Sequence, residues 1–182
     1  MKKLLLIAFA CLAATLAPVA RAEVPLTLLL TGGNEDNAIR ISLSPDGRDY
    51  VIVSAATLEA GGDICWHPEE RLNELHCKAP AIAGFEVNAG GGDDSVVLAS
   101  DIPIPATLRG GPGRDRLLGG DAADKIVGGP GPDYLTGRHG DDWIFGGSGP
   151  DKLFGGPGND QLRGGPDTDL LVGGPGNNEL VQ

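Results

Sequence analysis

The sequence predicts an all-β protein in which a small irregular β region leads into a long solenoid of short strands and turns. Three observations predict this fold class. From Gly110 to Val181 the chain consists of eight consecutive nine-residue units, each beginning with glycine. The sixth position is aspartate in seven units, and the eighth position is leucine or isoleucine in all eight. A fixed short period is typical of architectures in which similar units stack on one another.

The nine-residue period excludes a helix. Nine residues make two and a half helical turns, so successive eighth-position side chains would face opposite sides. The glycine doublets favour turns, because glycine adopts positive φ at little steric cost. Each unit therefore supplies a turn from its glycine-rich half and a short strand around the eighth position. The aliphatic side chains at that position then stack into a thin apolar centre.

Residues 1–22 are typical of a cleaved secretory signal peptide. Lys2 and Lys3 precede an apolar run, which ends in the small-residue signature Ala20-Arg21-Ala22. The run is too short and wrongly flanked for a permanent membrane span. We therefore expect export, cleavage after Ala22, and no integral membrane segment in the mature chain. Lipidation of Cys11 is an alternative fate for this segment.

Residues 23–88 are expected to form an N-terminal β cap. Apolar and β-branched residues predict strands at 24–30, 39–43, 49–55 and 84–89, and a turn at residues 45–47. The stretch 68–76 weakly predicts one helical turn. Residues 89–182 then form the repeat domain, in which residues 89–97 are one further unit and a 12-residue stretch, 98–109, interrupts the period. Residues 32–40 resemble a decayed copy of the unit.

Two cysteines remain after signal cleavage, Cys65 and Cys77. In an oxidising compartment they predict a disulfide, which contributes on the order of 3 kcal/mol in the chain-entropy model. His67 and His76 stand beside these cysteines, so a zinc site is the alternative. The spacing does not match the usual finger or ribbon patterns, and thiols rarely stay reduced outside the cytoplasm.

Composition limits the classes of partner and activity. The formal net charge is −11, which argues against nucleic acid and anionic membranes as partners. The residues before the array contain neither an HExxH nor a GxSxG motif. We therefore expect a protein that is not an enzyme.

The aspartates of stacked units raise an electrostatic problem. Equivalent residues of neighbouring coils lie about 4.8 Å apart. Two carboxylates at that distance repel by about 3 to 4 kcal/mol at an effective dielectric constant of 20. A row of such charges opposes folding unless cations lie between them. Ca²⁺ accepts carboxylate and carbonyl oxygens in a flexible cage, so it suits these loops better than Mg²⁺.

Units such as "GGPGRDRLL" and "GGPGNDQLR" resemble the RTX, or hemolysin-type, calcium-binding nonapeptide repeat, G-G-x-G-x-D-x-U-x, where U is a large aliphatic residue. The resemblance implies a right-handed parallel β-roll in which two units make one coil. It also implies several Ca²⁺ ions between loops on the same edge, held by sixth-position aspartates and loop carbonyls.

Applied to this sequence, the resemblance implies two rows of metal ligands. One row contains Asp115, Asp133, Asp151 and Asp169, and the other contains Asp124, Asp142 and Asp160. Asp94, from the upstream unit, belongs to an N-terminal coil. Asn178 completes the second row without a charge, as expected of a capping unit. Arg138 replaces the second glycine before Asp142, which predicts a strained loop or a weakly held ion there.

Two functional interpretations follow. The protein is a calcium-binding module that folds when it meets the ion outside the cytoplasm, or it is a structural protein that contacts a surface or matrix partner and is only rigidified by calcium. Both interpretations place it outside the cell or on the cell surface, with the periplasm as an alternative location. Calcium-dependent assembly would favour the second interpretation.

Overall fold

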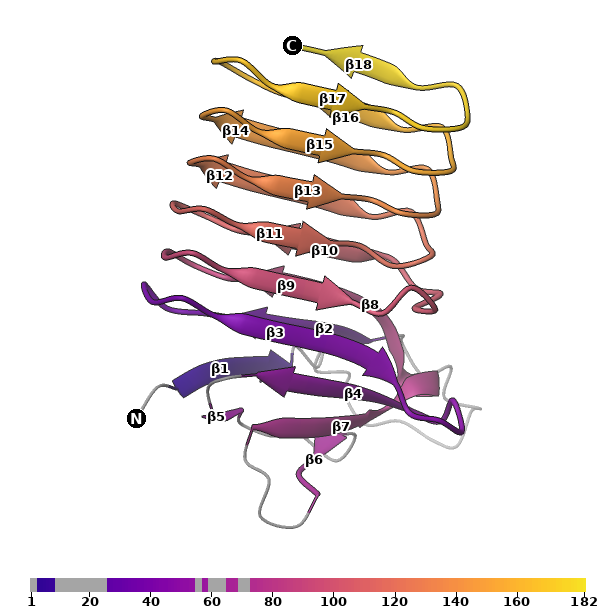
Figure 1. The fold of residues 1–182 in the computed structure, drawn as a ribbon. Coiled ribbons are helices and arrows are strands. Elements are labelled where there is room, and N and C mark those ends of the chain that lie inside the picture. The colour runs from indigo at the N-terminus through magenta and orange to yellow at the C-terminus, as the bar shows by residue number, and fades with distance from the viewer. Residues whose placement is uncertain (1–2, 9–25, 55–56, 59–64, 69–72) are drawn as a thin grey trace, which may run out of the picture.

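The computed structural model describes residues 3–8, 26–54, 57–58, 65–68 and 73–182, and it is a parallel β-solenoid (Figure 1). Two nine-stranded sheets face each other. The first contains, in spatial order, β5 (Thr57–Leu58), β1 (Lys3–Ala8), β2 (Leu26–Thr31), β8 (Ile82–Asn88), β10 (Ala106–Arg109), β12 (Lys125–Pro130), β14 (Trp143–Ser148), β16 (Gln161–Arg163) and β18 (Glu179–Val181). The second contains β6 (Cys65–Trp66), β7 (Glu74–Lys78), β4 (Asp49–Ser54), β3 (Ala38–Leu43), β9 (Ser95–Leu98), β11 (Arg116–Leu118), β13 (Tyr134–Thr136), β15 (Lys152–Phe154) and β17 (Leu170–Val172). The predicted all-β solenoid is confirmed, and one 3₁₀ turn, Ala79–Ala81, is the only helical element of the described residues.

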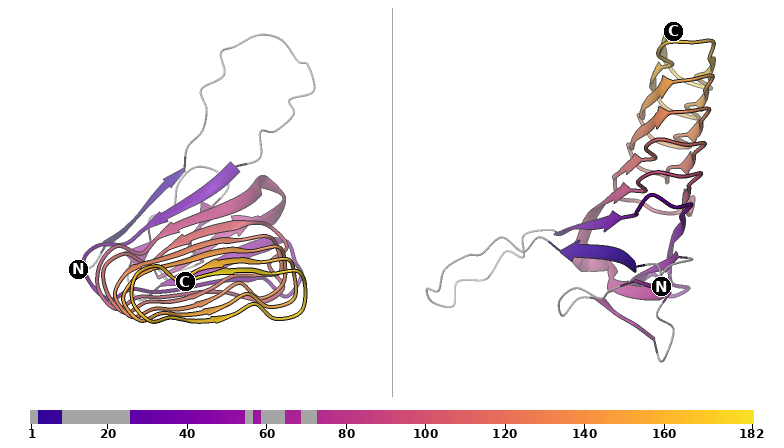
Figure 2. Two further views of the ribbon diagram at one scale, coloured as in Figure 1. Left: turned by 90° about the horizontal axis from the view of Figure 1, so that it is seen from above. Right: turned by 90° about the vertical axis from the view of Figure 1, so that its left-hand side faces the viewer.

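Two nine-residue units make one coil. Leu117 of β11 pairs in parallel register with Leu135 of β13, and Leu135 pairs with Leu153 of β15. On the other sheet, Ile126 of β12 pairs with Ile144 of β14. Partners are thus two units apart, and the coils superimpose when seen along the solenoid (Figure 2). Equivalent residues therefore form continuous rows along both sheets.

The stacked coils begin upstream of the regular array. Ile39 of β3 pairs in parallel with Val96 of β9, so residues 32–40 take the place of a unit, as their sequence indicates. The stretch 98–109 does not interrupt the stacking either. Its strand β10 pairs in parallel with β8 and β12, and Leu108 stands in register with Ile126. Three extra residues are therefore accommodated in the loop of this half-coil, while its strand keeps the register.

The N-terminal region largely follows the predicted strands, with one error. Strands β2, β3, β4 and β8 form where expected, and the turn at 45–47 joins β3 to β4. The helical turn predicted at 68–76 is wrong over residues 74–76, because Glu74–Lys78 forms strand β7. This strand pairs with β4 and β6, which buries Leu75 and Cys77. Cross-strand pairing here overrides local propensity. Residues 69–72 lie outside the described part of the chain.

The predicted signal peptide is described only at residues 3–8. They form β1, which pairs antiparallel with β2. Cys11 and the expected cleavage position after Ala22 lie outside the described residues. No helix within the described ranges is long and apolar enough to cross a membrane.

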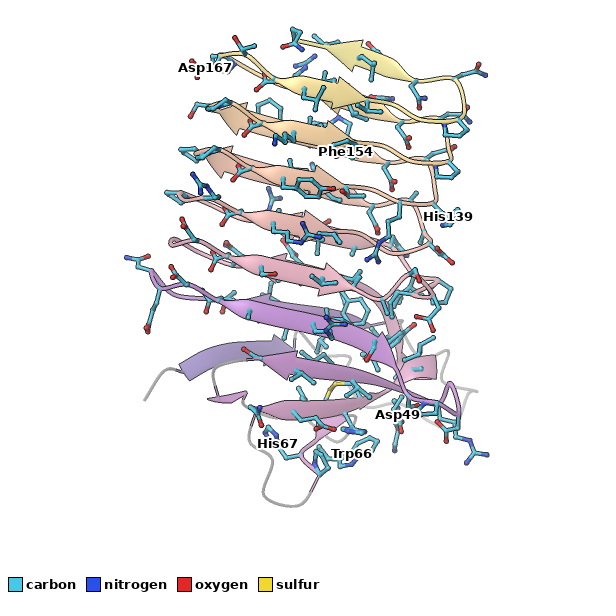
Figure 3. The ribbon with its side chains drawn as sticks, in the orientation of Figure 1. Asp49, Trp66, His67, His139, Phe154 and Asp167 are labelled. Atoms are coloured by element: carbon cyan, nitrogen blue, oxygen red, sulfur yellow. A yellow bond between two sulfur atoms is a disulfide. The ribbon has the colours of Figure 1, made fainter. Side chains whose placement is uncertain are left out.

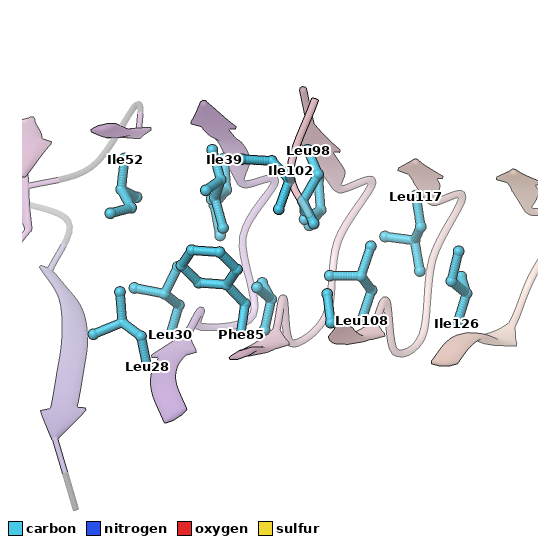
Figure 4. Close-up of a cluster of buried hydrophobic side chains, with 14 of the residues drawn as sticks. Leu28, Leu30, Ile39, Ile52, Phe85, Leu98, Ile102, Leu108, Leu117 and Ile126 are labelled. Atoms are coloured by element: carbon cyan, nitrogen blue, oxygen red, sulfur yellow. The ribbon is translucent and has the colours of Figure 1, made fainter. Parts of the chain in front are cut away.

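The hydrophobic core is a narrow column that widens towards the N-terminal end (Figure 4). In the inner coils it consists of the eighth-position side chains, such as Leu135 and Ile144, which are fully buried. At the wider end the Tyr50 and Phe85 rings pack edge-to-face with centroids 4.9 Å apart. Leu180 in the last coil is 49% exposed. The apolar column is thus complete inside the array and thins out at its C-terminal end.

This difference in burial predicts a difference in stability between two chemically identical substitutions. Leu135→Ala should lower the free energy of unfolding by about 2–5 kcal/mol, because it leaves a cavity in the column. Leu180→Ala, at the same position of the repeat, should cost less than about 1 kcal/mol. Urea unfolding followed by circular dichroism measures both values. Equal losses would contradict the assigned core.

Candidate metal sites on the loop edges

The loops between the two sheets form two rows on opposite edges of the solenoid. Figure 3 labels Asp167 on one edge and His139 on the other. Hydrogen bonds between successive coils place the aspartates of the array in the two expected rows, and they put Asp94 on the same edge as Asp115. Asp94, Asp115, Asp133, Asp151 and Asp169 follow one another on the first edge, and Asp124, Asp142, Asp160 and Asn178 follow on the second.

One carboxylate oxygen of each aspartate holds neighbouring coils together. Asp133 Oδ1 accepts a hydrogen bond of 2.8 Å from the backbone N–H of Asp115. Asp142 Oδ1 accepts a bond of the same length from the backbone N–H of Asp124. The aspartate side chains are buried within the loops and do not extend into solvent, since seven of the eight are only 1–3% exposed. The exception is Asp169, in the outermost complete coil, which is partly buried.

The second carboxylate oxygen of the aspartates, Oδ2, has a different environment. In seven of the eight aspartates Oδ2 is buried and accepts no hydrogen bond from any described residue; these are Asp94, Asp115, Asp133, Asp142, Asp151, Asp160 and Asp169. The first glycine of each unit leaves room for this atom. A Cβ built on Gly128 would lie 2.3 Å from Asp133 Oδ2 and 2.6 Å from the carbonyl oxygen of Gly146 in the next coil. A buried carboxylate oxygen thus faces a carbonyl oxygen, with no donor between them. Such a pair needs a positive charge or a proton.

The two asparagines at the ends of the rows support this interpretation. Asn178 Oδ1 accepts the same coil-to-coil bond from Asp160 N–H at 2.8 Å, but its Nδ2 donates to the Gly174 carbonyl at 2.9 Å. Asn37, below Asp94, donates from Nδ2 to the Ala89 carbonyl at 3.0 Å. At the ends of the rows an amide donor therefore fills the place where the aspartates present a second oxygen. In the inner loops that place fits a cation.

Burial also changes the proton affinity of the carboxylates. It raises the pKa of Asp115 to about 6, that of Asp133 to about 7 and that of Asp142 to about 8. The neighbouring aspartates of the row add to this shift through like-charge repulsion. Near neutral pH these groups therefore bind either a proton or another cation.

The donor set favours a hard cation. Each inner loop of the array buries one carboxylate, and backbone carbonyl oxygens lie next to it. No group of three or more His, Cys, Asp or Glu side chains suited to a metal occurs within the described ranges. Most of the ligands on these edges must therefore be carbonyl oxygens. Carbonyls combined with a few carboxylates suit Ca²⁺, whereas zinc prefers nitrogen and sulfur ligands.

The predicted disulfide between Cys65 and Cys77 is confirmed. It joins β6 to β7, and both cysteines are buried. The histidines beside them have other partners, since His67 Nδ1 lies 2.8 Å from the Glu74 carbonyl and His76 Nε2 lies 2.8 Å from the Glu74 carboxylate. The oxidised sulfurs offer no thiolate ligands for the alternative zinc site.

Comparison with known proteins agrees with this geometry. The family model of the RTX calcium-binding nonapeptide repeat (four copies) matches residues 107–135, 118–153 and 146–180. Residues 107–180 are therefore similar to an RTX repeat array. RTX repeats imply calcium binding, so Ca²⁺ is the ion that the oxygen-lined loops fit. No curated protein and no solved structure matches the chain.

The first RTX loop on the second edge departs from the others. Asp124 Oδ2 accepts a hydrogen bond of 2.7 Å from Gly120 N–H, so both of its oxygens have partners. Below it, Ala106 of the half-coil 98–109 occupies the sixth position and contributes only its backbone N–H. Sequence analysis did not recognise this half-coil as a unit. Leu108, two residues after Ala106, has the spacing of an eighth position and could have revealed it.

Two adjacent aspartates, one buried and one exposed, allow the effect of a buried carboxylate to be compared with that of a surface carboxylate. Asp142→Asn should keep the coil-to-coil bond, as Asn178 does, while removing the carboxylate. Without calcium the folded state should gain on the order of 1–3 kcal/mol, because the cost of burying an unpaired carboxyl group is removed, and at least one bound Ca²⁺ should be lost. Asp141→Asn is the control, since Asp141 is exposed and its change in charge is the same. Calorimetric titration and urea unfolding measure both quantities, and equal effects of the two variants would contradict the site.

The raised pKa values predict an unusual pH dependence. Protonation of these carboxyl groups stabilises the folded state relative to the unfolded chain. This stabilisation is complete below the unfolded-state pKa near 4 and is lost as pH rises through the folded-state pKa values of about 6 to 8. Without calcium the array should therefore be less folded at pH 8 than at pH 5, while calcium affinity should rise over the same range. Circular dichroism on protein dialysed free of divalent ions tests this. Greater ion-free stability at pH 8 would show that the carboxylates are not desolvated.

Proposed function

We propose that the protein is an exported calcium-binding protein whose RTX array folds in response to Ca²⁺. The observation that carries the proposal is the buried second oxygen in seven of the eight aspartates, which has no partner among the described residues. Each such oxygen is a local defect of the ion-free fold and a ligand of the ion-loaded fold. Calcium binding and folding are therefore coupled through the same atoms.

The coupling arises from the chain's own arrangement. Parallel stacking sets Asp115, Asp133 and Asp151 in one row, so their charges oppose the folded state together. Bound calcium supplies positive charge between these carboxylates. Because an unfolded chain has no such row, each ion stabilises the fold by an amount that grows with calcium concentration. Several weak sites then act together as a sensitive switch.

Export is supported by three independent features. Residues 1–22 have the layout of a secretory signal peptide, and RTX repeats are typical of exported proteins. The Cys65–Cys77 disulfide is typical of oxidising compartments. Extracellular calcium is the expected trigger for folding, and no catalytic role is proposed.

A second candidate function is surface or matrix interaction. It is favoured by aromatic and cationic side chains on the outer faces of the sheets. Lys125 Nζ lies 4.8 Å from the ring centroid of Trp143, which is 37% exposed, and Arg116 stacks on Tyr134 in the same way. In this function calcium only rigidifies a rod that presents these faces.

Far-UV circular dichroism of the purified protein, titrated with CaCl₂ after removal of divalent ions, distinguishes the two functions. Folding on calcium predicts a coil-like spectrum that becomes β-type at sub-millimolar to millimolar Ca²⁺, with little response in a matched MgCl₂ series. A β-type spectrum that chelation leaves unchanged would refute coupled folding. Light scattering on the same samples detects calcium-dependent assembly, which would support the second function. The N-terminus of protein recovered outside the cytoplasm, read by mass spectrometry, tests export and is expected at Glu23.

A further inference from the structure

The loop that contains Arg138 departs from the repeat in sequence but keeps its backbone conformation. Arg138 stands where the repeat has its second glycine, and its φ is +81°, a conformation that favours glycine. The side chain does not extend into solvent but is partly buried against the two preceding coils. A costly backbone conformation is thus combined with a guanidinium placed among the loops. Such a combination points to a role for the side chain.

The guanidinium binds backbone carbonyls of two different coils. Arg138 Nη1 donates to the Leu98 carbonyl at 2.5 Å and to the Gly119 carbonyl at 2.8 Å. Leu98 begins the irregular half-coil 98–109, and Gly119 begins the unit that contains Asp124. The next residue makes a parallel link, because His139 Nδ1 lies 2.9 Å from Asp121 Oδ1. Arg138 therefore ties three successive loops of this edge together.

The hydrogen bonds of the underlying loop are rearranged around this side chain. In the regular loops the backbone N–H of the second glycine donates to the carbonyl of the first glycine in the next coil. Gly111 donates to Gly128 in this way, and Gly156 donates to Gly173. Gly120 instead donates to Asp124 Oδ2 at 2.7 Å. Asp124 is consequently the one predicted ligand whose two carboxylate oxygens both have partners within the described chain.

We propose that Arg138 takes the place of a calcium ion at the loop of Asp124. Its guanidinium is a fixed positive charge that binds loop carbonyls, as calcium does in the other loops, and it can be neither released nor chelated. Asp124 is then not a calcium ligand, although its sequence position is that of one. The first loop of the array on this edge is then stable without a metal ion. The half-coil below it has Ala106 at the sixth position and supplies no carboxylate. This inference rests on calcium binding by the array, which belongs to the proposed function.

Restoring the consensus glycine tests the substitution. Arg138→Gly should bind one more Ca²⁺ per chain than the natural protein in equilibrium dialysis, and it should need more calcium to fold. Arg114→Gly is the matched control. Arg114 is an exposed loop arginine on the other edge, and its substitution removes the same charge. Its ion count should equal that of the natural protein. An unchanged count in a folded Arg138→Gly variant would overturn the inference.

A second pair of variants does not depend on how Arg138→Gly folds. Asp124→Asn should leave the number of bound ions unchanged, whereas Asp142→Asn, one coil further along the same edge, should lower it. Loss of an ion in Asp124→Asn equal to that in Asp142→Asn would overturn the inference, while calcium binding itself would stand. If the natural protein bound no calcium at all, the proposed function would fail, and the inference would fail with it.

Discussion

The structure depends on one constraint, which is that parallel stacking brings identical side chains into rows. In the apolar column this is favourable, because each Leu or Ile packs on the Leu or Ile of the next coil. In the loops the same rule aligns buried aspartates, and their charges work against the stack. The fold therefore needs positive charge at its edges as much as it needs apolar contact in its centre. Its two ends avoid this need, because neutral asparagine amides replace the carboxylates there. In its inner loops we propose that an ion or the Arg138 guanidinium supplies the charge.

Each aspartate has two separate roles, carried by its two oxygens. Oδ1 accepts a backbone N–H from the neighbouring coil, which is a structural bond that asparagine makes equally well. Oδ2 makes no such bond in most loops, and in the proposed function it is the atom that binds the ion. This division explains why aspartate, rather than asparagine or glutamate, fits the sixth position of the inner units. The shorter side chain fixes one oxygen on the backbone and still presents a charge to the gap between coils.

Most of the fold could be predicted from the sequence because the repeat is regular. The period and the stacking of eighth-position residues follow from spacing, whereas the division of the aspartates into two rows follows from the resemblance to the RTX repeat. The helical turn predicted near Glu74 was wrong, because the pairing of β7 with β4 and β6 depends on residues distant in the sequence. The role of Arg138 could not be predicted for the same reason. Its partners Leu98 and Gly119 are 40 and 19 residues away and are brought close only by the stacking of coils.

The asymmetry between the two ends of the solenoid has a mechanical consequence. One end is wide, disulfide-linked and closed by antiparallel strands, whereas the last coil is thin and leaves Leu180 half exposed. A pulling force on the C-terminus would therefore detach the outermost coil first and then each coil in turn, rather than rupture the whole domain at once. Each detached coil of two nine-residue units would lengthen the chain by about 60 Å. Calcium concentration would set the force at which this peeling begins, so the array would behave as an extensible tether whose stiffness follows its ionic surroundings.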